Sequence, residues 1–189
     1  MRRVAFPAMR FLRDRRGVAA VEFALIAPIM LLFYFGLAEF TQAMVAERKA
    51  IRTASAIGDL VAQNDSIEPT GSGGISDVFD IASTLMKPFP TGTKLKLCVA
   101  SISADSTGKK TVDWAKNQND ATCSKGTLST TVSSDLLAAN QSVIVSRVIY
   151  SYTSPVNQTL KINPTFTKTY YLRPRRSATI ACVNSARPK

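Results

Sequence analysis

A long apolar segment directly after a basic N-terminus constrains the fold of this chain more than any other feature. Counted from Val18 to Phe40 the segment has 23 residues, and the sixteen residues between Glu22 and Glu39 carry no charge. A helix rises about 1.5 Å per residue, so this segment is long enough to cross a hydrocarbon core of roughly 30 Å. The sequence therefore predicts a membrane anchor, with enough remaining length for one compact domain.

The distribution of charge predicts how the anchor is oriented. The chain has a formal net charge of +11, and the first seventeen residues hold six arginines against Asp14 alone, which gives +5. Basic residues stay on the cytoplasmic side of a membrane helix, so we expect a cytoplasmic leader over residues 1–17 and an external C-terminal region. The remaining +6 is an ordinary basic surface, and no nucleic-acid-binding module is recognisable, so nucleic acid is not predicted as a partner.

The anchor is expected to stay attached to the rest of the chain. A secretory signal peptide has a shorter apolar core and a small-x-small cleavage site. Here the core is long, and helical sequence continues from Glu39 to Gln63. We predict a transmembrane helix over residues 18–44, loosened or kinked at Pro28, and an amphipathic helical extension over residues 45–63.

Two sets of residues, one apolar and one small, indicate which side of the helix is expected to pack. The apolar positions that follow a helical repeat are Phe40, Met44, Ile51, Ala54 and Val61. The small residues that keep the helix slim are Ala43, Ala46, Ala50, Ala56 and Gly58. The pattern predicts a helix packed against the external domain, and the alternative is a helix that only spaces this domain from the bilayer.

The remaining residues, 64–189, are expected to form an external α+β head, with a helix first and an antiparallel sheet after it. Residues 64–74 have the composition of a loop, and a second helix is predicted from Ser76, as its N-cap, to Lys87. Alternating apolar residues then predict strands at Lys94–Ile102, Thr111–Ala115, Ser142–Tyr152, Thr167–Leu172 and Ser177–Val183.

Residues that carry chemistry are scarce. The chain has no histidine, which removes the commonest general base and the commonest metal ligand. No phosphate-binding loop, dinucleotide motif or nucleophile elbow occurs, so neither an enzyme nor a cofactor is predicted. Cys98, Cys123 and Cys182 lack metal-site spacing. If the external side of the membrane is oxidising, one disulfide among them is expected, with all three pairings open.

Two groups of charged residues are interpreted as solvent-exposed. Asp77 and Asp80 share a predicted helix, and we interpret them as part of its solvated face. Arg173, Arg175 and Arg176 favour a solvated strand end, and contact with anionic lipid or a partner is the alternative interpretation of this cluster.

Glu22 is the residue that most needs a physical explanation, because a carboxylate is costly inside the apolar run. It lies five residues after Gly17, where the basic leader ends. Either Glu22 lies in the membrane interface and pairs with a leader arginine, or it has a specific partner, such as the N-terminal amine of a neighbouring subunit.

The segment Arg16–Pro28, RGVAAVEFALIAP, resembles the start of TadE/TadG-like pseudopilins, the minor pilin-like proteins of the Tad (Flp) pilus system. It also resembles type IV prepilins, which have a basic leader ending in glycine and an apolar helix with Glu at mature position five. Cleavage after Gly17 would make Val18 the first residue and Glu22 the fifth, followed by the aromatic Phe23. Val18 departs from the Phe with which many pilins start.

The resemblance implies a minor pseudopilin in Tad pilus biogenesis, held in the bacterial inner membrane by one span with its head in the periplasm. Implied partners are other pilins and pseudopilins, the Tad inner-membrane platform, membrane lipid, and a prepilin peptidase acting between Gly17 and Val18. Glu22 and Phe23 would set the assembly register. The alternative is a membrane-anchored periplasmic scaffold or binding module that keeps its leader and enters no filament.

Overall fold

The computed structural model describes residues 16–70, 73–128, 132–133, 136–154 and 163–183. The predicted leader, apart from its last two residues, lies outside the described residues. The chain divides into two compact units, with the boundary between Thr41 and Gln42, and each is considered by itself. The domain boundaries predicted from the sequence, at residues 17, 44 and 63, stay predictions.

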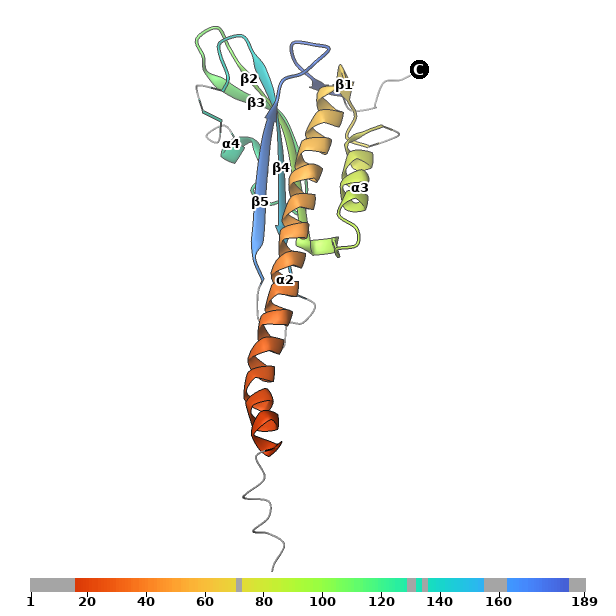
Figure 1. Cartoon of the computed structure of the whole chain (residues 1–189). Coiled ribbons are helices and arrows are strands. Elements are labelled where there is room, and N and C mark those ends of the chain that lie inside the picture. Colours follow the sequence, from red (N-terminus) through yellow and green to blue (C-terminus); the bar gives the residue numbers. More distant parts are fainter. Residues whose placement is uncertain (1–15, 71–72, 129–131, 134–135, 155–162, 184–189) are drawn as a thin grey trace, which may run out of the picture. The chain divides into compact units, whose positions relative to one another are not determined.

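One helix, α2 (Arg16–Ala62), accounts for 47 residues (Figure 1). It contains Pro28 in its interior, which membrane helices tolerate more readily than soluble ones. Among the described residues it is the one helix long and apolar enough to cross a membrane, with a mean hydropathy of 2.2 over its most apolar window. The long N-terminal apolar helix predicted from the sequence is confirmed.

The unit from Gln42 onward contains a four-stranded antiparallel sheet in the order β3-β2-β4-β5. The strands are β2 (Leu95–Ala104), β3 (Lys110–Gln118), β4 (Ser142–Ser151) and β5 (Thr165–Leu172). The central strands β2 and β4 are paired with Ala100 opposite Val145, and a bulge interrupts the β2–β3 register at Ser101 and Ile102. The α+β architecture is therefore confirmed.

Each face of the sheet has its own apolar core, because side chains alternate along β2. Leu97 and Val99 join a core shared with α2 and with α3 (Ile75–Leu85). Ala100 and Ile102 join a second core, covered by the segment after β3 that includes α4 (Lys125–Leu128). Covering both faces explains why β2 is buried along nearly its whole length, as is usual for a central strand.

The face by which α2 packs within this unit differs from the predicted one. Its buried stripe is Ala43, Ala46, Ala50, Ala54, Ile57 and Val61, all at most 6% exposed. Ala54 and Val61 were predicted for this face, and Ala43, Ala46 and Ala50 were predicted as small residues that keep the helix slim. Met44 is 39% exposed, so its placement on this face is wrong. Small side chains form the packed face because the sheet lies close to the helix backbone.

Contacts between α2 and β4 demonstrate how close this approach is. The Ser146 hydroxyl of β4 donates a hydrogen bond of 2.7 Å to the Ala54 carbonyl oxygen of α2. A Cβ added at Gly58 would lie 2.5 Å from Leu172 Cδ1 and 3.0 Å from Ser146 Cβ. The sheet therefore lies against the backbone of α2 at Ala54, and a side chain at position 58 would be crowded by Ser146 and Leu172.

The helix α3 begins one residue earlier than predicted and is capped differently. Its N-cap is Gly74, which has no side chain to accept a hydrogen bond, so the predicted cap at Ser76 is wrong. Instead the Asp77 carboxylate accepts a hydrogen bond of 2.7 Å from the Gly73 N–H. An acidic side chain in the first turn also favours the helix through its interaction with the helix dipole.

The last predicted strand is shorter than expected and lies outside the four-stranded sheet. It is β6 (Ala181–Cys182), which pairs in parallel with β1 (Ser66–Ile67), a strand that the sequence pattern did not predict. The preceding residue, Ile180, is buried, and its carbonyl oxygen accepts a hydrogen bond of 2.6 Å from Trp114 Nε1. A short helix, η1 (Gly92–Lys94), leads into β2.

We expect Gly58→Val to destabilise the head by about 2 kcal/mol, because its side chain would overpack the contact with Ser146 and Leu172. The measurement is urea unfolding of the full protein in detergent, followed by the fluorescence of Trp114, the only tryptophan and 6% exposed. Gln42→Val, at an exposed position of the same helix, controls for the helix propensity of valine. Equal urea midpoints for Gly58→Val and Gln42→Val would contradict the close approach of α2 to the sheet.

Candidate functional site

The predicted processing and assembly residues all lie in the first two turns of α2. Val18 and Phe23 are 54% and 71% exposed, and Glu22 is also exposed. A side chain added at Gly17 would meet nothing within 4 Å. These four residues are therefore accessible within the unit that ends at Thr41, and no described residue of the chain covers Gly17.

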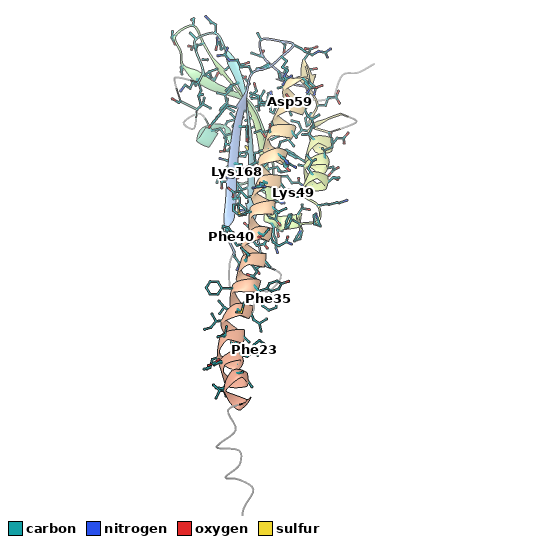
Figure 2. The ribbon with its side chains drawn as sticks, viewed as in Figure 1. Phe23, Phe35, Phe40, Lys49, Asp59 and Lys168 are labelled. Atoms are coloured by element: carbon teal, nitrogen blue, oxygen red, sulfur yellow. A yellow bond between two sulfur atoms is a disulfide. The ribbon has the colours of Figure 1, made fainter. Side chains whose placement is uncertain are left out.

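Large apolar side chains surround this part of α2 on all sides. Phe23, Phe35 and Phe40 project outward from the helix, as Figure 2 shows, and are 71%, 43% and 58% exposed. The other exposed large apolar residues between positions 18 and 37 are Val18, Val21, Leu25, Ile26, Ile29, Met30, Leu31, Leu32, Phe33, Tyr34 and Leu37. A helix that is apolar all round needs a bilayer or neighbouring helices to cover it.

Glu39 is the second carboxylate of this segment, and its environment is opposite to that of Glu22. It is 3% exposed, and neither carboxylate oxygen has a hydrogen-bond partner among the described residues. A buried acceptor without a donor is costly to stability. Its spacing places Glu39 on the same side of the helix as the buried Ala43 and Ala46, a signal that the sequence reasoning did not use.

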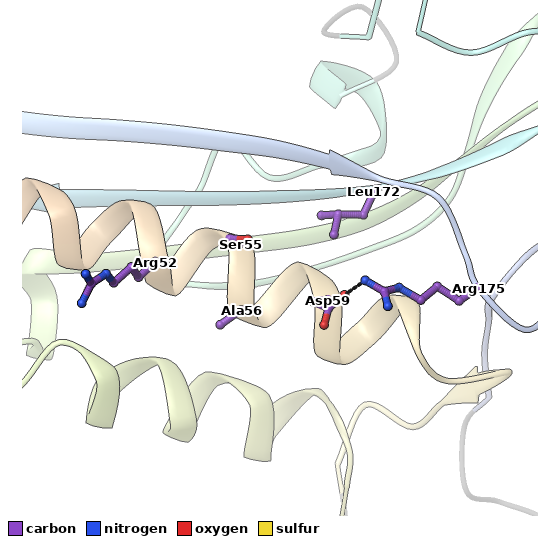
Figure 3. A pocket seen from close by; sticks show the side chains of 6 residues that line it. All are labelled: Arg52, Ser55, Ala56, Asp59, Leu172 and Arg175. Carbon is purple, nitrogen blue, oxygen red and sulfur yellow. Dashed lines mark hydrogen bonds and ion pairs between the residues drawn. The ribbon is translucent and has the colours of Figure 1, made fainter.

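A hollow of about 470 Å³ lies between α2 and the end of β5. We call it the arginine groove, and its lining residues are Arg52, Ser55, Ala56, Asp59, Leu172 and Arg175 (Figure 3). A second hollow of about 510 Å³, lined by Gln63, Arg175 and Arg176, shares Arg175 with it. Both belong to the unit that begins at Gln42.

Arg175 holds the segment after β5 against the C-terminal end of α2. Its guanidinium donates a hydrogen bond to the Asp59 carboxylate and forms an ion pair with it. Its backbone N–H donates a 2.9 Å hydrogen bond to the carbonyl oxygen of Ala62, the last residue of α2. The cluster predicted as a solvated strand end is indeed exposed, but it includes this contact, which sequence reasoning missed.

One disulfide joins Cys98 of the central strand β2 to Cys123 in the segment after β3, with 5.7 Å between their Cα atoms. Of the three pairings left open by the sequence, this is the one in the structure. It closes a loop of 25 residues, for which loop-closure entropy corresponds to about 3 kcal/mol. Cys182 is a free, half-buried thiol, and burial raises its pKa, against the charge of Lys116, which lowers it.

A buried ion pair beside the disulfide was not predicted. The carboxylate of Asp120, which is 2% exposed, accepts hydrogen bonds of 2.8 Å from Arg147 Nη2 and 2.7 Å from the Thr122 hydroxyl. Burial alone would raise the pKa of Asp120, but the hydrogen bonds from Thr122 and Arg147 and the charge of Arg147 together lower it. The carboxylate is therefore ionised at neutral pH.

The side chains of these surfaces are suited to binding other molecules. Within the described part of the chain, no cluster of three or more His, Cys, Asp or Glu residues could hold a metal ion. The apolar surface of α2 can contact lipid or other helices, and the arginine groove can contact anions.

Within the described residues the chain has one helix able to span a membrane and an α+β head. Residues 17–58 match the family model of TadE-like proteins. The match lies wholly within α2 and includes Gly17, Glu22 and Gly58. No curated protein and no solved structure is significantly similar to the chain.

Acid should destabilise the head in part through Asp120, whose pKa is lowered by folding. A carboxylate with a depressed folded pKa stabilises the protein above its unfolded pKa, near 3.8, and loses this contribution as the pH falls through the folded value. We expect Asp120→Asn to lower the free energy of unfolding at pH 7 by about 2 kcal/mol, because Arg147 loses its charged partner.

The measurement is urea unfolding of both proteins between about pH 7 and pH 3, and the variant should lose less of its remaining stability on acidification. Some acid dependence should persist, because hydrogen bonds from Thr107 and Lys109 also lower the pKa of Asp105. Asp65→Asn, at an exposed position, is the matched control. Parallel pH curves for Asp120→Asn and the wild type would contradict the assignment.

Proposed function

We propose that this protein acts in Tad pilus assembly as a minor pseudopilin-like subunit that assembles through α2. The observation that carries the proposal is the TadE-like segment, a helix whose large apolar side chains are exposed on all sides around one exposed carboxylate, Glu22. Such a surface suits insertion among lipids and side-by-side packing with other apolar helices.

Glu22 would set the register of this packing. In a bilayer an isolated carboxylate is costly, and it gains most from a cation on a neighbouring helix. Cleavage between Gly17 and Val18 would create such a cation, the new amine of Val18. Because the attraction falls with distance, an axial slip between two subunits would separate the charges and be disfavoured.

Charge and compartment support the proposed orientation and partners. The basic leader would hold the N-terminus in the cytoplasm and leave the head in the periplasm. The Cys98–Cys123 disulfide supports this side, since the periplasm is oxidising. Other pilins, the inner-membrane platform of the Tad system, lipid and a prepilin peptidase are the proposed partners, and the role is structural rather than enzymatic.

Processing is the first test of the proposal. Co-expression with a prepilin peptidase should yield a mature chain that starts at Val18, measured by intact mass of the membrane-extracted protein. Gly17 is in the first turn of α2, where glycine weakens the helix by about 1 kcal/mol and eases local opening for the peptidase. Gly17→Val should block the cut. An unchanged Met1 terminus would instead support the scaffold that keeps its leader.

The second test concerns Glu22. We expect Glu22→Ala to insert into the membrane normally but to reduce cross-linking to other pilins by about tenfold or more, because the partner charge is left unpaired. Glu22→Gln, which keeps the shape and removes the charge, should behave the same way. Gln42→Ala, at an exposed position of α2 outside the apolar surface, is the control. Wild-type cross-linking and piliation in both Glu22 variants would exclude the register role.

A further inference from the structure

We propose that the end of the head at which α2 enters binds anionic phospholipid headgroups of the membrane that anchors the protein. We call this surface the basic end, and it consists of Arg48, Lys49, Lys87, Lys94 and Lys96. The inference concerns side chains of the unit that begins at Gln42. It rests on the proposed function in one respect, namely that the apolar part of α2 spans a membrane.

Helix α3 and the segment after it bring these cations to one end of the head. The Lys49 side chain of α2 donates a 3.3 Å hydrogen bond from Nζ to the carbonyl oxygen of Leu85, the last residue of α3. Lys87 follows two residues later and is exposed. Lys94 ends η1, and Lys96 is the second residue of β2, so both lie at the start of the sheet.

Pairing within the sheet places the same end of β4 and β5 beside them. Leu95, the first residue of β2, is opposite Tyr150 near the end of β4, and β5 begins opposite Ser151. The 2.6 Å ion pair of Glu47 with Lys168 joins the first half of β5 to α2, and Figure 2 shows Lys49 and Lys168 at this part of the head. The cations therefore come from several elements that meet where the chain enters the unit.

The positive charge of the basic end is not neutralised within the head. None of its five cations forms an ion pair with a described residue. Two carboxylates at this end are already paired, Glu47 with Lys168 and Asp120 with Arg147. Asp80, on the exposed side of α3, is one carboxylate against five cations.

The opposite end of the head, at the β2–β3 turn and the end of α2, exposes charges of both signs. Its exposed acidic residues include Asp65, Glu68 and Asp105, and its exposed basic residues include Lys109, Arg173 and Arg176. The excess of positive charge therefore belongs to the end that follows the apolar part of α2.

The position of the first two cations along α2 matches the depth of lipid headgroups. The predicted span ends at residue 44, and Arg48 and Lys49 follow within about 8 Å along the helix axis. The headgroup layer on each side of the hydrocarbon core is about 5–8 Å thick. Both side chains would then reach phosphate groups, and each basic residue near an anionic surface strengthens binding by about fivefold.

Apolar side chains are exposed beside the cations. Met44 and Val45, one turn before Arg48, are 39% and 40% exposed, and Leu85, two residues before Lys87, is 39% exposed. Basic and apolar side chains together are typical of surfaces that lie in the membrane interface. None of the five cations lines either hollow described above. They therefore suit a planar array of headgroups better than one small ligand.

The test is acetylation of lysines by a water-soluble reagent, read by mass spectrometry, on the full protein in vesicles. One set of vesicles is phosphatidylcholine alone, and the other also contains phosphatidylglycerol. We expect Lys87, Lys94 and Lys96 to react about fivefold more slowly in the anionic vesicles, whereas Lys109, at the opposite end, should react equally in both. Added salt should remove the difference through screening.

Protein variants locate the contact. Arg48→Gln with Lys87→Gln should remove most of the protection of the remaining lysines, because two basic residues together contribute about 25-fold to membrane affinity. Arg173→Gln with Arg176→Gln removes the same charge from exposed positions of the opposite end and should leave the protection intact. The fluorescence of the buried Trp114 checks that the variants are folded.

Equal acetylation in the two vesicle types, in protein that floats with both, would overturn the proposal and leave the membrane anchor standing. Protein that floats with neither would overturn the anchor and this proposal together. Glu22→Ala should leave the protection unchanged, so failure of the register role is a separate result.

A different occupant would also overturn the proposal. Protection in phosphatidylcholine alone that rises with the number of protein copies per vesicle would assign the basic end to a second copy of this chain. Protection by soluble glycerol phosphate in the same vesicles would assign it to a free anion.

Discussion

The close approach of α2 to strand β4 is the contact on which the rest of the head depends. Ser146 reaches the backbone carbonyl of Ala54, and Gly58 leaves no room for a side chain beside Ser146 and Leu172. Alanines at every third or fourth position make this possible along several turns. Because the helix supplies a slim face, the sheet can bury its own larger residues, such as Leu97 and Tyr150, against it.

The same helix has two different surfaces because its composition changes along its length. Up to Phe40 its large apolar side chains point outward in all directions, which suits lipid or other helices. From Ala43 the small residues collect on one buried side, and charged residues such as Arg48 and Arg52 are exposed. One continuous α2 therefore carries both the TadE-like apolar surface and one wall of the head.

Local patterns predicted the elements well, because helix and strand periodicity are properties of neighbouring residues. The helix from Arg16, the apolar face of α3 and the alternation along β2 and β4 all follow from spacing. The packed face of α2 was predicted only in part: Ala54 and Val61 lie on it, but the helical repeat also placed the larger Met44 there, whereas the short distance to the sheet selects small side chains. Two contacts join residues more than a hundred positions apart, and no local pattern can predict them. They are the parallel pairing of β1 with β6 and the ion pair of Asp59 with Arg175.

The attachments of α2 to the sheet have a mechanical consequence. Glu47 pairs with Lys168 at 2.6 Å, Ala54 accepts from Ser146, and Asp59 pairs with Arg175. These three attachments are spread over twelve residues of α2, or about 18 Å of its axis, and they reach β5, β4 and the segment beyond. A force along the axis of α2 would act in shear on all three attachments at the same time, and on the buried alanine face as well. The three contacts should therefore resist extraction of α2 from the head together. Contacts that carried the force one after another would instead break one at a time.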